Sequence, residues 1–171
     1  MPESTILLNG IDEGINVKVT SVLEGPESPK LILESIQNVF PDFFISQEVA
    51  EPVFGKSVKQ IWQNNKISIN NFLQMIHKQA ILDTALDVMS MNLENDKTYF
   101  EILRQASIVG KIAFNINTNI PLGGVISVEL SGAGLPEWLE AATWHKGRDS
   151  IPKKIDDERA MEDDGEPSNW I

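Results

Sequence analysis

The chain of 171 residues is 42% hydrophobic and 23% charged, and it carries a formal net charge of −11 at pH 7. This length fits one domain with a sizeable core, and no apolar run approaches the roughly eighteen residues that a membrane span needs. The absence of cysteine excludes disulfides and thiolate metal sites, and two histidines are too few for the usual zinc sites, so we expect no bound metal.

The N-terminal part of the chain predicts one strand and one helix. Apolar and polar side chains alternate over residues 15–23, as they do in a strand with one buried face. A helix is expected over 29–40, because Ser28 suits the N-cap, Pro29 suits the first turn and apolar residues recur at helical spacing. Pro41 ends this helix, since proline disfavours helical backbone in the residue before it.

Six further elements complete the prediction. They are strands at 43–52, 53–62, 98–103, 111–116 and 125–130 and one helical segment at 68–91, with a helical half-turn near QAS at 105–107. This order describes an α+β fold of two layers, in which a mainly antiparallel or mixed sheet carries two helices on one face. The expected core includes Ile36, Phe72, Ile76, Leu82, Ile112, Phe114 and Val128. Strands and helices do not alternate one by one, so no Rossmann-type site and no cofactor are expected.

The C-terminal part differs in composition from the rest of the chain. Leu135, Trp138 and Leu139 follow helical spacing and predict a short amphipathic helix, whereas the residues beyond it are polar, acidic and poor in aliphatics. We therefore divide the chain into a single α+β domain, 1–134, and an extension, 135–171, that holds this helix and an acidic polar tail. The apolar stripe should pack on the domain's own sheet or on a second subunit, which makes its three residues candidate partner contacts.

No catalytic or phosphate-binding motif occurs, and we expect no enzymatic activity. His77 falls in an amphipathic helix and is expected to pack rather than to act as a base, and His145 is expected at the surface. The acidic runs 156–158 and 162–164 place carboxylates together, as a Mg²⁺ site requires, but such runs are more typical of solvated tails. The N-terminus lacks the features of a signal peptide, so we expect a cytoplasmic protein without a membrane anchor.

Four short motifs together resemble a known family. ILDTALDV (81–88) is followed by RQAS (104–107), VGK (109–111) and PLGGVISVEL (121–130), in an order and spacing that extend the match over residues 15–130. They resemble a small archaeal family of uncharacterised proteins, described as predicted RNA-binding or predicted exosome-associated proteins. The resemblance implies a fold similar to that of the ribosomal protein that binds five-S RNA, a sheet with two helices on one side. It also implies an accessory role in RNA processing.

The stretch RQASIVGK places hydrogen-bonding side chains inside an otherwise apolar run, and under this resemblance they are candidate RNA contacts. Arg104, Gln105 and Lys111 would contact phosphates or 2′-hydroxyls from an open sheet face or its edge. Lys56 and Lys59 would extend that surface. The acidic net charge weighs against this interpretation, because phosphate contacts depend mainly on lysine and arginine.

A structural interpretation of the same stretch stays open beside it. Gln105 would satisfy backbone groups where the strand breaks, and Gly110 would permit the unusual backbone there. The expected partners of Arg104 and Lys111 are then Glu101, Asp83 or Asp87.

The sequence therefore leaves two functions of different classes. The first is an RNA-binding accessory factor, and a positive stripe across the candidate lysines and Arg104 would favour it. The second is a non-enzymatic protein-interaction module, or a homo-oligomeric structural domain such as a homodimer, that uses the C-terminal helix and tail. An exposed apolar sheet face or an exposed C-terminal helix would favour the second.

Overall fold

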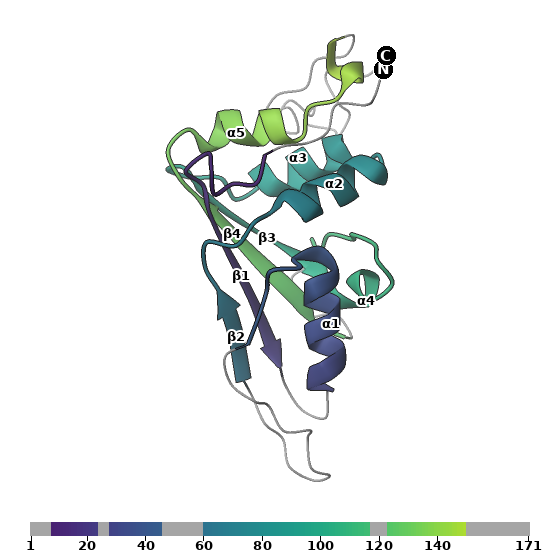
Figure 1. The fold of residues 1–171 in the computed structure, drawn as a ribbon. Helices are drawn as coiled ribbons and strands as arrows, with labels where there is room; N and C mark the ends of the chain where they lie inside the picture. The colour runs from purple at the N-terminus through teal and green to yellow at the C-terminus, as the bar shows by residue number, and fades with distance from the viewer. Residues whose placement is uncertain (1–7, 24–27, 46–59, 117–122, 150–171) are drawn as a thin grey trace.

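The computed structural model describes residues 8–23, 28–45, 60–116 and 123–149 (Figure 1). Its strands are β1 (Asn16–Leu23), β2 (Gln60–Asn64), β3 (Lys97–Leu103) and β4 (Val125–Ser131). Its helices are α1 (Pro29–Val39), α2 (Asn70–Lys78), α3 (Leu82–Ser90), α4 (Arg104–Ser107) and α5 (Leu135–Ala142), followed by a short 3-10 helix at Lys146–Asp149. Within these ranges, no helix has the length and apolar character needed to cross a membrane.

The four strands form one antiparallel sheet in the order β2-β1-β4-β3. β1 is central: its Val19 faces Asn64 of β2 on one side and Val128 of β4 on the other. β4 also pairs with β3, where Val128 faces Phe100. Figure 1 shows α1, α2 and α3 along one side of this sheet. The predicted two-layer α+β fold, with helices on one face, is confirmed.

Local signals set the bounds of α1 as predicted. The Ser28 hydroxyl accepts a hydrogen bond from the backbone N–H of Leu31 at 3.4 Å, and Pro29 occupies the first helical position. The last helical hydrogen bond runs from the N–H of Phe40 to the carbonyl of Ile36 at 2.8 Å. These contacts satisfy backbone groups that a helix end would otherwise leave without partners.

The helix predicted over 68–91 is divided at Ala80 into α2 and α3. Ala80 has a φ of 58°, a left-handed conformation that a residue with a Cβ seldom adopts. Its N–H donates to the carbonyl of His77, and the N–H of Ile81 donates to that of Ile76, both at 3.1 Å. This is the Schellman arrangement, which usually places glycine at the left-handed position. Because this position is an alanine rather than a glycine, the sequence gives no signal that the helix breaks here.

The strands predicted between residues 43 and 62 differ from the structure. Residues 43–45 belong to no strand, and Phe44 is instead held by the side-chain amide of Asn64, which accepts its N–H and donates to its carbonyl, both at 2.9 Å. The strand predicted over 53–62 overlaps with β2 from Gln60 onward. Residues 46–59, which hold the rest of both predicted strands, lie outside the described part of the chain.

The strand predicted over 111–116 is wrong. This segment makes one isolated bridge, between Phe114 and Ile102 of β3. The Gln79 side chain forms hydrogen bonds with both backbone groups of Ile112. It accepts the N–H at 2.7 Å and donates to the carbonyl at 3.1 Å. Because Ile112 gives its backbone groups to the end of α2, they are not available for a ladder with β3.

An aromatic cluster lies at the centre of the core. The ring centroid of Phe72 is 6.1 Å from that of Phe40, 5.5 Å from that of Phe100 and 6.3 Å from that of Phe114. Rings at these separations contribute somewhat more than their buried area alone. The predicted core residues are buried, except that Phe114 is half-buried; they are Ile36, Phe72, Ile76, Leu82, Ile112, Phe114 and Val128.

Candidate functional site

Arg104 follows the last residue of β3, and its side chain turns into the molecule. It is 5% exposed. Its Nε donates to the carbonyl of Gly123 at 2.7 Å, and its Nη1 donates to the Ser21 hydroxyl at 2.9 Å and to the Val22 carbonyl at 3.0 Å. Its backbone N–H donates to the carbonyl of Gly124 at 3.2 Å. Arg104 thus joins the ends of β1 and β3 to the start of β4, which favours the structural interpretation of this residue.

Gly124 makes room for this arginine. It has a φ of +75°, and a Cβ on Gly124 would overlap the guanidinium of Arg104. The preceding Gly123 has a φ of +88° and its carbonyl receives the hydrogen bond from Nε. The motif RQAS and the glycine pair of PLGG therefore depend on each other, because Arg104 fills the space that Gly124 leaves and Gln105 the space that Gly123 leaves.

The other candidate RNA contacts are placed differently. Gln105 and Lys111 are exposed, before and after a turn in which Gly110 has the expected positive φ of 77°. Lys56 and Lys59 lie outside the described residues. Among the residues that the structure describes, the candidate side chains therefore do not join with Arg104 in one basic surface.

The three candidate partner contacts on α5 lie inside the molecule. Leu135 and Leu139 are fully buried and Trp138 is 7% exposed, and they belong to the same core cluster as the sheet and the other helices. α5 packs against α3. The indole N–H of Trp138 donates to the Glu13 carboxylate at 2.9 Å. The stripe is thus covered by the chain itself, one of the two arrangements expected from its pattern.

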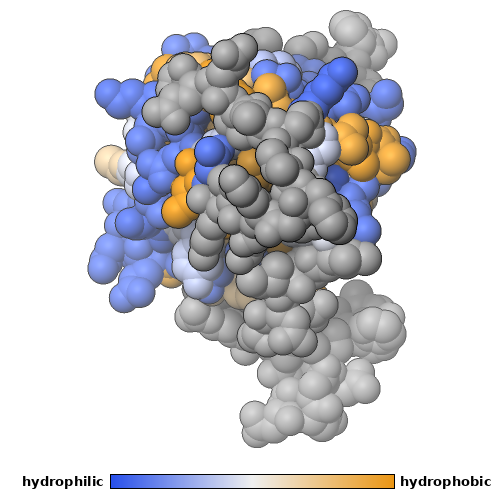
Figure 2. All heavy atoms as spheres, turned by 90° about the horizontal axis from the view of Figure 1, so that it is seen from below, coloured by the Kyte–Doolittle hydropathy of each residue, from blue (hydrophilic) through white to orange (hydrophobic). Residues whose placement is uncertain are grey.

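No described helix covers the other face of the sheet, which we call the uncovered face (Figure 1). At one end of it lie Ile61, Val22, Val125 and Leu103, one residue from each strand, and we call them the apolar row. Val22 pairs with Ile61 and Leu103 with Val125, and the pairing of Ser21 with Ile126 brings the two pairs together. Ile61 is 63% exposed and Val22 is 37% exposed. Figure 2, which views the molecule from below, shows apolar groups in several separate patches.

The rest of the uncovered face is polar and nearly balanced in charge. Glu129 stands between Lys18 and Tyr99 in one cross-strand row, and its carboxylate lies 3.3 Å from Lys97 Nζ. With Glu101, this face carries two lysines and two glutamates, whereas the whole chain has a net charge of −11. A neutral surface gives little attraction for phosphates and is compatible with a protein contact.

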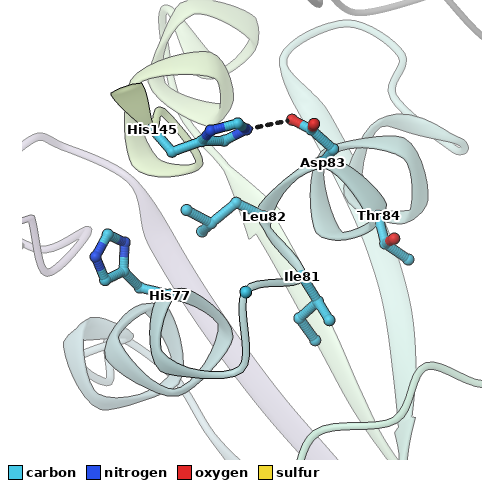
Figure 3. A pocket seen from close by; sticks show the side chains of 7 residues that line it. His77, Ile81, Leu82, Asp83, Thr84 and His145 are labelled. Carbon is cyan, nitrogen blue, oxygen red and sulfur yellow. Dashed lines mark hydrogen bonds and ion pairs between the residues drawn. The ribbon is translucent and has the colours of Figure 1, made fainter. Parts of the chain in front are cut away.

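A pocket of about 290 Å³ lies where α2 turns into α3. It is lined by His77, Ala80, Ile81, Leu82, Asp83, Thr84 and His145. Figure 3 shows Leu82 between the two histidines, with His145 turned toward Asp83. The Nδ1 atom of His77 is buried and has no hydrogen-bond partner in the described structure. Among the residues that the structure describes, no group of three or more histidine, aspartate or glutamate side chains could hold a metal ion. The pocket therefore offers two separate imidazoles and no metal centre.

Asp83 holds the segment that follows α5. Its Oδ1 accepts hydrogen bonds from His145 Nε2 at 2.9 Å and from Arg148 Nε at 3.0 Å. Arg148 Nη2 also lies 2.9 Å from Asp83 Oδ1, as an ion pair without hydrogen-bond geometry. Arg148 Nη1 donates to the Glu140 carbonyl at 3.2 Å, in the last turn of α5. Arg148 is 6% exposed, so these contacts compensate a buried charge. A cation at the end of α5 and a carboxylate in the first turn of α3 also suit both helix dipoles.

Burial raises the pKa of Asp83, but the hydrogen bonds and charges of His145 and Arg148 together outweigh it and hold this pKa below its ordinary value of 3.8. Asp83 is therefore ionised at neutral pH. From the sequence, His145 is expected at the surface and Arg148 has no expected role. Their contacts with Asp83 join residues more than sixty positions apart, and no local pattern signals such a pairing.

Comparisons with known proteins add relatives. No family model matches the chain. A UPF0201 protein of Methanothermobacter thermautotrophicus is 28% identical over 126 residues, 72% of this chain and 89% of the relative. A UPF0201 protein of Methanocaldococcus jannaschii is 24% identical over 111 residues, 65% of this chain and 61% of the relative. The crystal structure of a UPF0201 protein from Methanococcus jannaschii has a TM-score of 0.62 at 20% identity and covers 75% of this chain and 99% of its own, which shows a shared fold.

Proposed function

We propose that this chain, which is similar to archaeal UPF0201 proteins, is a non-catalytic protein-interaction module. Its contact surface is the uncovered face of the sheet, centred on the apolar row. The apolar row is the main observation in support, because four neighbouring strands each add one exposed or half-exposed aliphatic side chain at the same level of a rigid sheet. Adjoining apolar groups on a rigid surface are typical of protein contacts.

The partner that fits this surface is a protein that presents aliphatic side chains beside uncharged hydrogen-bonding groups. The row next to the apolar row contains Gln63, Thr20 and Ser127, which carry no charge, and ends in Glu101 on the edge strand β3. Removing water from such groups costs less than removing it from unpaired charges. The lysines and glutamates lie at the margin and balance each other, so we expect binding that depends weakly on ionic strength.

RNA is the second candidate ligand, and Tyr99 is the observation that favours it. Tyr99 is 56% exposed on the uncovered face, with Lys97 two residues before it on the same strand. RNA-binding sheets stack bases on exposed aromatic rings and neutralise phosphates with neighbouring cations. With the family resemblance, this supports an accessory role in RNA processing. Glu129 opposes it, because its carboxylate pairs with Lys97 and repels phosphate.

One experiment separates the two candidates. The tagged full-length chain is cross-linked in cells of its native host, and the proteins and RNA that it retains are identified. The variant Ile61→Asp places a charge in the apolar row, and Ile11→Asp places the same charge at another exposed isoleucine, in the turn before β1. A third variant replaces Tyr99 by serine and Lys97 by glutamate.

If the uncovered face binds a protein, an identified protein partner should stay bound after nuclease treatment and in high salt. The Ile11→Asp variant should retain this partner, and the Ile61→Asp variant should lose it. The RNA candidate expects RNA that is released by salt and lost in the Tyr99 and Lys97 variant. A partner that is retained equally by all three variants would overturn the assignment of the uncovered face.

A further inference from the structure

The turn before β1 contains the one Asn-Gly pair of the sequence, Asn9-Gly10. Such a pair has an intrinsic reactivity. The backbone nitrogen of the glycine can attack the side-chain carbonyl carbon of the asparagine, because glycine has no Cβ to hinder the approach. The product is a five-membered succinimide, and the side-chain nitrogen leaves as ammonia.

The folded turn engages both reacting groups in hydrogen bonds. The Asn9 amide is fixed at both of its atoms, since Oδ1 accepts the N–H of Asp12 at 2.8 Å and Nδ2 donates to the Asp12 carboxylate at 2.9 Å. The N–H of Gly10 donates to Glu13 Oε1 at 2.8 Å. The attacking nitrogen must lose this proton, and a carboxylate beside it disfavours the anion that would form.

The same Glu13 oxygen connects the turn to α5. Besides the N–H of Gly10, it accepts the N–H of Asn9 at 3.0 Å and the indole N–H of Trp138 at 2.9 Å. One carboxylate oxygen thus fixes the reactive pair and a side chain 125 residues away. Separation of Trp138 from Glu13 removes one of the contacts that hold the turn closed.

We propose that Asn9-Gly10 is a latent deamidation site that the docked α5 keeps closed through Glu13. When the turn opens, a bond forms between the Gly10 nitrogen and Asn9 Cγ, and the bond from Cγ to Nδ2 breaks. Ammonia leaves with the former amide proton of Gly10. Water then opens the ring, which leaves aspartate or isoaspartate at position 9.

The product destabilises the closed turn. The new carboxylate at position 9 lies where Nδ2 of Asn9 donated to Asp12. A hydrogen bond is thereby replaced by repulsion between the carboxylates at positions 9 and 12. The modified turn consequently stays open and leaves Glu13 less well placed to receive Trp138.

The test follows position 9 by peptide mass spectrometry while the full-length chain is held in mildly alkaline buffer. The native chain should convert slowly and the chain unfolded in urea fast. Glu13→Ala removes the acceptor and should speed conversion about tenfold, as loss of hydrogen bonds to a charged group predicts. Trp138→Phe keeps a smaller aromatic ring and removes the donor, and it should give a smaller acceleration. Glu137→Ala, an exposed position on α5, should leave the rate unchanged.

Equal rates in the native and urea-unfolded chains would overturn the proposal, because the turn would then give no protection. If Glu13→Ala does not fold, Trp138→Phe decides: a rate equal to that of the unmodified chain would overturn the link to α5. Acceleration by Glu137→Ala as large as that by Trp138→Phe would also overturn it, because the effect would then be a general loosening of α5.

Discussion

The two faces of the sheet are built by the same alternation along the same strands, yet they differ in what they contain. On the covered face, Val19, Val128 and Phe100 are buried against the helices. On the uncovered face, aliphatic side chains are confined to one end, and polar groups, balanced charges and Tyr99 occupy the rest. The comparison teaches that the apolar row is not needed to close the core. Substitutions on the two faces should therefore separate stability from binding.

The largest expected effect tests the covered face at its centre. Phe72→Ala should lower the free energy of unfolding by about 3–5 kcal/mol, because it removes a fully buried ring and leaves a cavity among three other rings. Urea denaturation measures this change. Phe72→Leu fills most of the space and should cost clearly less. An unchanged midpoint for Phe72→Ala would mean that the cluster does not hold the helices to the sheet.

The second prediction concerns the glycine that accommodates Arg104. Gly124→Ala should cost about 2–4 kcal/mol, because the new Cβ overlaps the guanidinium and the residue has a positive φ. Gly110→Ala is the matched control, since Gly110 has a similar φ of +77° with no atom within 4 Å of the added Cβ, and it should cost about 1 kcal/mol.

A double-mutant cycle with Arg104→Ala sharpens this test. The two substitutions should be less than additive, because removal of the guanidinium relieves the overlap. Equal costs at both glycines, or strict additivity with Arg104→Ala, would contradict the close packing of Gly124 on Arg104.

The third prediction concerns how the stability that Asp83 contributes on the helical side of the molecule depends on pH. Asp83→Asn should cost about 1 kcal/mol at neutral pH, a small value because the Asp83 side chain is 49% exposed and its ion pair is screened by solvent. The pKa of Asp83 is lowered in the folded state, so the stability it contributes is present above the unfolded value of 3.8 and is lost as pH falls through the lower folded value.

The difference between the original chain and Asp83→Asn should therefore shrink below about pH 4 in denaturation experiments. Asp42→Asn, at an exposed carboxylate, is the control. A difference that persists unchanged in acid would show that Asp83 acts through its shape rather than its charge.

The smallest expected effect belongs to the uncovered face. Tyr99→Ser and Ile61→Ser should each change the free energy of unfolding by less than about 0.5 kcal/mol, because both side chains are more than half exposed. In the binding experiment, Ile61→Ser should weaken retention of a protein partner, and Tyr99→Ser should weaken retention of RNA. A loss of stability as large as that of Phe72→Ala would mean that the comparison of the two faces is wrong.

The elements that sequence predicts well are those with local signals. Alternation identifies β1 and β4, Ser28 and Pro29 mark the start of α1, and the spacing of Leu135 and Trp138 identifies α5. The break at Ala80 has no such signal, because alanine, unlike glycine, is not typical of the left-handed conformation. The loss of the strand over 111–116 depends on Gln79, which contacts Ile112 across 33 positions of sequence.

The candidate site is less predictable than the fold for the same reason. Alternation shows that each strand has two faces, but only the packing of the helices decides which face stays uncovered. Arg104 illustrates the limit, because its partners Ser21 and Gly123 lie 83 and 19 positions away. A basic residue in an apolar run has the same local pattern whether it meets a ligand or the chain's own carbonyls.

The central place of β1 has a consequence for how the protein is made. Of the four described strands, β1 leaves the ribosome first, and its partner β4 follows about a hundred residues later, as the contact between Ser21 and Val125 across 104 positions shows. Until then, β2 is the only described strand that can pair with β1, and the unpaired edge of such an unfinished sheet is prone to aggregation. Pairing across long sequence separations also slows folding. The order in which translation delivers the strands is thus not the order in which the sheet is completed.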